Sequence, residues 1–140
     1  MGVKRIDPDR AKELLDGGQG FTYIDVRTQD EFHSGHVPGA KNVPFLVRGP
    51  GGAGLKPNEQ FLDTMQGAFE RDAKIILGCK KGGRSGQASQ LLAQEGFTNI
   101  HDMRGGYVGE TDPFENILFP GWQARGFPTT TDSSAEDVLV

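Results

Sequence analysis

A run of apolar residues without polar alternation is the feature that most constrains the fold of this chain. Residues 73–77 end in Ile-Ile-Leu, which is typical of a strand buried on both faces of a parallel sheet. A glycine-containing loop follows, and residues 85–94 then have the apolar spacing of a helix that stops at Gly96. Residues 99–103 complete a strand-helix-strand unit, in which the strand at 73–77 is expected to be central.

The preceding part of the chain repeats this alternation of strands and helices. Strands are predicted at residues 21–26 and 41–43. An Asp-Pro pair at 7–8 opens one helix, the capping-box spacing of Thr28 and Glu31 opens a second, and residues 58–69 form a third. This order predicts a single α/β domain with a mainly parallel sheet covered by helices on both faces, which suits a length of 140 residues.

Three segments lie outside this alternation. Residues 47–57 are rich in glycine and proline and are predicted to form a surface excursion. Residues 110–120 carry four large apolar side chains and indicate an inserted loop that docks on the domain or on a partner. Residues 130–140 hold acids and serines but no aromatic residue, so we expect a disordered acidic tail after a domain at residues 1–129.

Composition excludes several classes of partner. The formal net charge of −4 argues against nucleic-acid binding. No apolar run approaches the roughly 20 residues that span a bilayer, so no membrane partner is predicted. The single cysteine, Cys79, excludes an intramolecular disulfide and favours a reducing compartment. We therefore expect a cytoplasmic location, with an organelle also allowed.

The residues best placed for chemistry form the loop that follows the central strand. Its sequence is Gly78-Cys79-Lys80-Lys81-Gly82-Gly83-Arg84-Ser85. A strand that leads through glycines into a helix gathers backbone N–H groups around one point, and the helix dipole adds positive potential there. The amides and cations favour the thiolate form of Cys79, which makes it a candidate nucleophile. The alternative, a buried structural cysteine beside a solvated basic turn, fits three cations and two glycines less well.

Three chemistries compete for this loop. The spacing of Gly78, Gly83 and Ser85 mimics a nucleotide-binding Walker A loop, but Arg84 stands where that loop needs lysine. A cysteine phosphatase encloses five residues between its cysteine and arginine, whereas Cys79 and Arg84 enclose four. The shorter loop makes a smaller cradle, which suits a sulfurtransferase that holds a sulfane sulfur on its cysteine.

The loop resembles the Cys-x-x-Gly-x-Arg-Ser active loop of single-domain rhodaneses. Other segments agree with this family in order and spacing over about residues 5–128. They are Asp25-Val26-Arg27 with Glu31-Phe32, residues 35–44 (GHVPGAKNVP), Gly105-Gly106-Tyr107, and Trp122 with Gly126-Phe127-Pro128. Residues 110–120 interrupt the family's closing pattern.

The resemblance implies a rhodanese-like three-layer domain with a five-stranded, mainly parallel sheet, in which Cys79 becomes a persulfide. It implies a small anionic sulfur donor such as thiosulfate, a thiol or cyanide acceptor that includes thioredoxin-like proteins, and no cofactor. A thiolate attacks sulfur directly, so no metal or dedicated general base is required. The loop residues are then predicted to bind the substrate, with Lys80 and Lys81 attracting a dianion. The other members of this set are Gly82, Gly83, Arg84 and Ser85.

Several residues near these motifs are predicted to support the site. We expect Asp25 to form an ion pair with Arg84, with Arg27 nearby. The resemblance makes His36 a structural hydrogen-bonding residue. A metal site is not predicted, because Gly35 breaks the helix between His33 and His36 and only His101 remains as a third imidazole.

Two other functions stay open at this stage. A regulatory or sulfur-carrier rhodanese module would bind a protein partner without much turnover, although the intact cysteine argues against an inactive domain. Arsenate reduction at the same cradle is the second, because arsenate is also a tetrahedral oxyanion; the four-residue spacing disfavours it.

Overall fold

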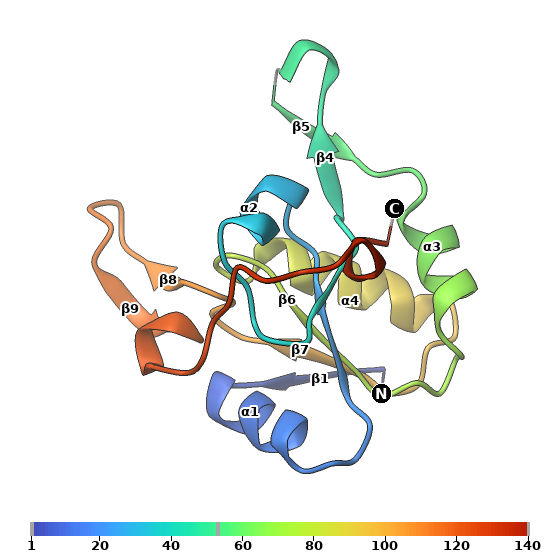
Figure 1. Cartoon of the computed structure of the whole chain (residues 1–140), viewed down its shortest axis with the longest axis horizontal. Coiled ribbons are helices and arrows are strands. Elements are labelled where there is room, and N and C mark those ends of the chain that lie inside the picture. The colour runs from blue at the N-terminus through green and yellow to red at the C-terminus, as the bar shows by residue number, and fades with distance from the viewer. Residues whose placement is uncertain (1, 53, 140) are drawn as a thin grey trace.

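The computed structural model describes residues 2–52 and 54–139; Met1, Ala53 of the excursion and Val140 of the expected tail lie outside the described residues. Its centre is a parallel sheet of five strands in the order β1-β7-β6-β2-β3 (Figure 1). The strands are β1 (Val3–Ile6), β2 (Thr22–Asp25), β3 (Lys41–Asn42), β6 (Ile75–Gly78) and β7 (Ile100–Met103). All four residues of β6 are buried, and β6 is the middle strand, as its apolar run predicts.

Helices cover both faces of the sheet, which confirms the predicted α/β architecture. On one face, α3 (Phe61–Ala68) and α4 (Gly83–Gln94) pack against side chains such as Leu77. On the other face, α1 (Pro8–Asp16) and α2 (Gln29–His33) pack against side chains such as Ile76. The predicted capping box of Thr28 and Glu31 is present at the start of α2. Among the described residues, no helix is both long and apolar enough to cross a membrane.

Strand β1 is not among the strands predicted from the sequence. This edge strand pairs in parallel with β7, from Val3 opposite Ile100 to Ile6 opposite Met103. Its two middle residues are the exposed Lys4 and Arg5. Edge strands commonly carry charges that prevent further strand pairing, and so this strand lacks the apolar pattern that identifies β6.

Two antiparallel hairpins project from the body of the domain (Figure 1). The predicted excursion holds β4 (Leu46–Arg48) and β5 (Leu55–Pro57), with the short helix η1 (Pro50–Gly52) between them. The predicted insertion holds β8 (Gly109–Thr111) and β9 (Ile117–Pro120), and the short helix η2 (Gln123–Arg125) follows.

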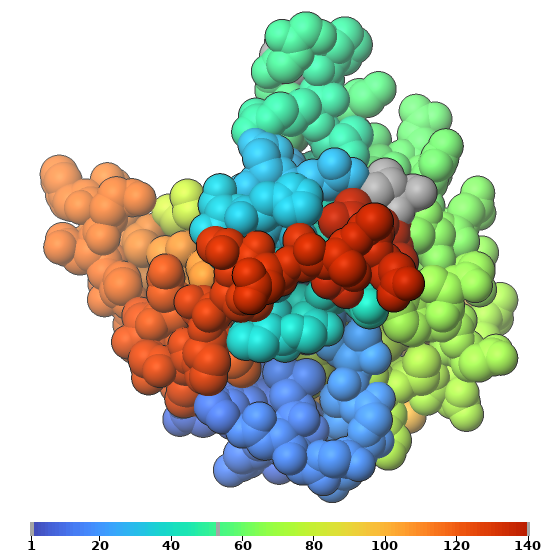
Figure 2. All heavy atoms as spheres, in the orientation of Figure 1, coloured from blue at the N-terminus to red at the C-terminus, as the bar shows by residue number. Residues whose placement is uncertain are grey.

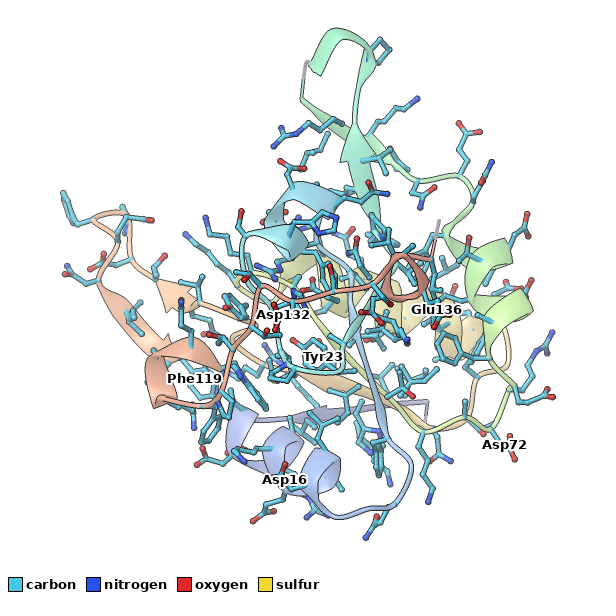
Figure 3. All side chains as sticks on the ribbon, viewed as in Figure 1. Asp16, Tyr23, Asp72, Phe119, Asp132 and Glu136 are labelled. Carbon is cyan, nitrogen blue, oxygen red and sulfur yellow. The ribbon has the colours of Figure 1, made fainter. Side chains whose placement is uncertain are left out.

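Docking of the β8–β9 hairpin on the domain involves only part of its apolar surface. Phe119 lies against two guanidinium groups, with its ring centre 3.9 Å from Arg104 and 5.0 Å from Arg125. Figure 3 shows Phe119 where β9 runs into η2. Phe114 and Leu118 remain 84% and 70% exposed. The hairpin is therefore held at its base, while its far end presents apolar side chains to solvent.

The segment after residue 129 differs from the disordered tail that its composition suggests. Thr130 pairs with His36, the short helix η3 (Ala135–Asp137) follows, and Val138 forms a parallel bridge with Asn42 of β3. Figure 2 shows this segment lying across the surface beside α2. The open edge of β3 supplies backbone partners that composition cannot show, because their position depends on the fold.

Candidate active site

Cys79 directly follows the central strand and is only 2% exposed. The backbone N–H of Gly82 donates a hydrogen bond to its Sγ at 3.1 Å. Gly82 has φ +120°, a conformation that favours glycine, and it is the N-cap residue directly before helix α4. The sulfur therefore lies in a short turn at a helix N-terminus, and the amide and the helix dipole both favour negative charge on it.

The Gly105-Gly106-Tyr107 segment holds the loop from its other side. The N–H of Tyr107 donates to the Cys79 carbonyl at 2.7 Å, and the N–H of Val108 donates to the Lys80 carbonyl at 2.9 Å. A Cβ on Gly106 would lie 2.4 Å from the Cys79 carbonyl oxygen, so a side chain there would displace the loop. This contact gives a physical reason for glycine at position 106.

Arg84 pairs with Glu31 of α2. Its guanidinium donates to the two carboxylate oxygens at 2.7 and 3.1 Å. Burial opposes ionisation of Glu31, but hydrogen bonds from Arg84 and from Thr28 outweigh it and lower the Glu31 pKa to about 2. The expected pairing of Arg84 with Asp25 is wrong, because Asp25 already has a nearer cation in Arg27.

Asp25 and Arg27 form a buried pair at the end of β2. Arg27 Nη2 lies 2.7 Å from Asp25 Oδ2, and the same nitrogen donates to the carbonyl of Gly35 at 2.7 Å. Burial alone would lower the Arg27 pKa, but the hydrogen bond and charge of Asp25 raise it. The Arg27 guanidinium lies 4.4 Å from the ring centre of Tyr107, so the pair supports the loop beside Cys79 indirectly.

His36 is buried and connects three segments of the chain. Its Nδ1 lies 2.7 Å from the Phe32 carbonyl oxygen, and its Nε2 lies 3.0 Å from the carbonyl oxygen of Asp132 in the C-terminal segment. Its ring also stacks on Phe32 with centres 3.8 Å apart. Within the described ranges, no cluster of three or more potential metal ligands occurs.

The two lysines of the loop have different surroundings. Lys80 is exposed. The Lys81 ammonium instead lies 2.8 Å from Thr111 Oγ1 and 3.4 Å from Glu115 Oε2, both in the β8–β9 hairpin. The hairpin therefore engages one of the two cations that the sequence analysis assigns to substrate binding.

Asp102 is a buried site residue that the sequence analysis does not identify. It lies on β7, next to β6, and its Oδ1 accepts a hydrogen bond of 2.7 Å from Ser85. Burial raises the Asp102 pKa, against the opposing effects of the Ser85 hydrogen bond and the Arg5 charge. The sequence does carry one signal for Asp102. It is an acidic residue within the strand predicted at residues 99–103, next to the central strand.

In this α/β domain, a cysteine lies at the end of a strand and its sulfur faces an amide of a tight loop that carries cations. This arrangement is suited to chemistry at sulfur. Residues 7–110 match the profile of the family described as Rhodanese-like domain, and the chain belongs to that family. The loop sequence and the flanking segments of similar order and spacing carry the resemblance to the same family.

Named relatives share most of the chain. Thiosulfate sulfurtransferase 16, chloroplastic, of Arabidopsis thaliana is 39% identical over 110 residues, which cover 79% of this chain and 80% of the relative. Thiosulfate sulfurtransferase 18 of the same plant is 36% identical over 132 residues, covering 93% and 85%. The crystal structure of Rv0390 from M. tuberculosis matches 92% of this chain and 98% of its own with a TM-score of 0.75 at 24% identity, a likeness of fold.

Proposed function

We propose that this protein moves a sulfane sulfur from thiosulfate, or a similar anionic donor, to a thiophilic acceptor through a persulfide on Cys79. The observation that carries this proposal is the 3.1 Å hydrogen bond from the Gly82 amide to Cys79 Sγ inside a loop with two lysines. That arrangement favours a sulfur anion both before and after it has taken on a second sulfur. Two relatives that carry the name thiosulfate sulfurtransferase support the choice of donor.

The reaction balances without an added redox partner. The Cys79 thiolate attacks the outer sulfur of thiosulfate, a Cys79–sulfur bond forms, and the donor's own sulfur–sulfur bond breaks. Sulfite leaves with that electron pair. A thiolate or cyanide then attacks the outer sulfur of the persulfide and regenerates the Cys79 thiolate. The cationic loop lowers the barrier by attracting the dianion and by stabilising the leaving sulfite.

The β8–β9 hairpin is our candidate for acceptor recognition. It touches the active loop through Lys81, and its far end exposes Phe114 and Leu118. A small acceptor such as cyanide needs almost no contact surface, whereas a thioredoxin-like protein needs one. We therefore assign the hairpin to the choice among acceptors rather than to the sulfur chemistry.

A reducing compartment fits this mechanism, because the lone Cys79 has no second cysteine in the chain to protect or reduce it. We propose the cytoplasm or a comparably reducing organelle. One relative is named as chloroplastic and another as mitochondrial.

Mass spectrometry of the purified protein after thiosulfate treatment tests the proposal directly. We expect one added sulfur atom on the peptide that contains Cys79, its removal by cyanide, and no addition to the Cys79→Ser variant. No addition to the wild-type protein would refute the proposal. A persulfide that neither cyanide nor thiols discharge would instead favour the regulatory or sulfur-carrier module.

Arsenate reduction is the competing activity. A relative named Protein HIGH ARSENIC CONTENT 1, mitochondrial, from Arabidopsis thaliana is 34% identical over 110 residues. The short loop with four residues between Cys79 and Arg84 favours sulfur over a full tetrahedral oxyanion. Thiol-dependent arsenite formation measured beside sulfur transfer separates the two activities; faster arsenate turnover would reverse our choice.

A further inference from the structure

Three side chains form a continuous buried chain that starts at the nucleophile. The Cys79 thiol lies 3.6 Å from Ser85 Oγ, and Ser85 Oγ lies 2.7 Å from Asp102 Oδ1. Ser85 is fully buried and Asp102 is 7% exposed. The three residues come from the loop after β6, from α4 and from β7, so the fold brings them together rather than the sequence.

The direction of the hydrogen bonds follows from the single hydrogen of the Ser85 hydroxyl. That hydrogen has two acceptors within reach, the Asp102 carboxylate at 2.7 Å and the Gly82 carbonyl at 3.2 Å. The shorter bond goes to the carboxylate, and a charged acceptor makes the stronger hydrogen bond. The remaining lone pairs of Ser85 Oγ then face the Cys79 thiol, which donates its proton to them.

We propose that Asp102 accepts the Cys79 thiol proton through the Ser85 hydroxyl when the nucleophile forms. The S–H proton passes to Ser85 Oγ while the Ser85 hydroxyl proton passes to Asp102 Oδ1. The sulfur becomes a thiolate, Ser85 stays neutral, and Asp102 becomes a neutral acid. The reverse transfer returns the proton to Cys79 after the acceptor has removed the sulfur. Asp102 does not touch Cys79 and is a positioning residue that holds the proton.

The electrostatics of the site agree with this transfer. Without it, a thiolate and the Asp102 carboxylate would be two buried anions joined through a single hydroxyl, an arrangement that desolvation and repulsion disfavour. The transfer leaves one anion, which the Gly82 amide stabilises. Burial raises the Asp102 pKa, so this carboxylate holds a proton more readily than an exposed one.

Few charged groups face Asp102 from the surrounding elements. Arg5 of β1 lies opposite it in the sheet and lowers its pKa, but Arg5 also lies 3.8 Å from Glu110 of the β8–β9 hairpin. Tyr23 of β2 interacts with the Asp102 charge, and the Tyr23 pKa is raised mainly by burial. Cys79 lies nearest along the Ser85 path. None of these groups offers Asp102 a direct salt bridge within residues 2–52 and 54–139.

Alkylation of Cys79 by iodoacetamide tests the inference without any sulfur donor. The inference rests on the proposed function only in taking Cys79 as the nucleophile, so a failed persulfide assay and a failed alkylation test are separate outcomes. We expect Asp102→Asn and Ser85→Ala each to slow alkylation at neutral pH by at least about tenfold. The double variant should be no slower than either single variant, because both changes interrupt the same path.

The pH profile of alkylation distinguishes proton transfer from structural support. The wild-type rate should show two inflections with pH, one for each member of the coupled pair, and Asp102→Asn should show only one. A structural role would leave the shape of the pH profile unchanged.

The matched control is Asp72→Asn, which removes one charge from an exposed position before the start of β6 (Figure 3). It should alkylate at the wild-type rate. Alkylation of Asp102→Asn at or above the wild-type rate would overturn the inference. It would show that the Asp102 carboxylate only repels the thiolate and does not take its proton. Additive effects in the double variant would overturn it equally.

Discussion

The Lys81 ammonium lies 2.8 Å from the Thr111 hydroxyl, and this contact ties the loop that carries Cys79 to the β8–β9 hairpin. A negative partner, Glu115, lies 3.4 Å from the same nitrogen. Lys80, its neighbour in sequence, is exposed beside the same loop. Two adjacent lysines with one predicted role therefore have separate positions, one in contact with the hairpin and one directed to solvent.

We expect Lys80→Ala to raise the thiosulfate KM several-fold more than Lys81→Ala does. Lys80 contributes its full charge to the attraction of a dianion, whereas Glu115 partly cancels the field of Lys81. The Lys80→Ala variant should also lose most of the dependence of KM on ionic strength, because screening then has less attraction to weaken. Kinetics at several salt concentrations check this. Equal effects of the two substitutions would contradict it.

The exposed end of the hairpin leads to a prediction about acceptors. The double change Phe114→Ser with Leu118→Ser should lower kcat/KM about tenfold for a thioredoxin-like acceptor, since interface apolar anchors often contribute above 1 kcal/mol. With cyanide as acceptor, kcat/KM should not change. Leu55→Ser is the matched control, because Leu55 is an exposed apolar residue, 47% exposed, on the other hairpin. Equal losses with both acceptors would show that the hairpin only supports the loop.

The central layer of the fold could be predicted because its signals are local. The apolar run of β6, the Thr28–Glu31 capping box and the glycine-containing loop each depend on a few neighbouring residues. The same locality identifies Cys79. Residues 105–107, which hold the Cys79 loop, were found only by resemblance. Their contact with Cys79 depends on how the loop after β7 packs against the loop after β6.

Contacts between distant segments could not be predicted in the same way. A strand-end aspartate and a loop arginine predict an ion pair, but Arg27 reaches Asp25 from two residues away and leaves Arg84 to Glu31. Asp102 faces Ser85 only because β7 lies next to β6 and α4 packs over both strands. The charges of the residues alone do not predict which of them form ion pairs or hydrogen bonds. The distances between these side chains are set by the register of the sheet.

The Glu31–Arg84 ion pair should make stability depend on pH. The pKa of Glu31 is lowered from 4.5 to about 2 in the folded chain, so its contribution is fully present above 4.5 and is lost as pH falls towards 2. Glu31→Gln should therefore lower the free energy of unfolding by about 1–3 kcal/mol at neutral pH. Denaturant unfolding at several pH values measures this difference. A difference that persists at pH 2 would assign the loss to packing instead.

The C-terminal segment provides a direct comparison of composition with structure. A disordered tail contributes nothing to stability, so its removal would leave Tm unchanged. In the structure, the Leu139 N–H donates to the Asn42 carbonyl at 2.9 Å, and Lys41 Nζ lies 2.9 Å from Asp137 Oδ1. Val138 and Leu139 each pack against one of the two hydrophobic cores.

Deletion of residues 134–140 should therefore lower Tm by about 5 °C or more, because it removes apolar burial and uncovers the edge of β3. Two single variants localise the effect. Asp137→Asn should lower Tm slightly through the lost ion pair with Lys41, whereas Glu136→Gln, on an exposed residue of the same segment (Figure 3), should not. Calorimetry of the three variants measures each shift. A truncated chain with the wild-type Tm would show that this segment does not stabilise the domain in solution.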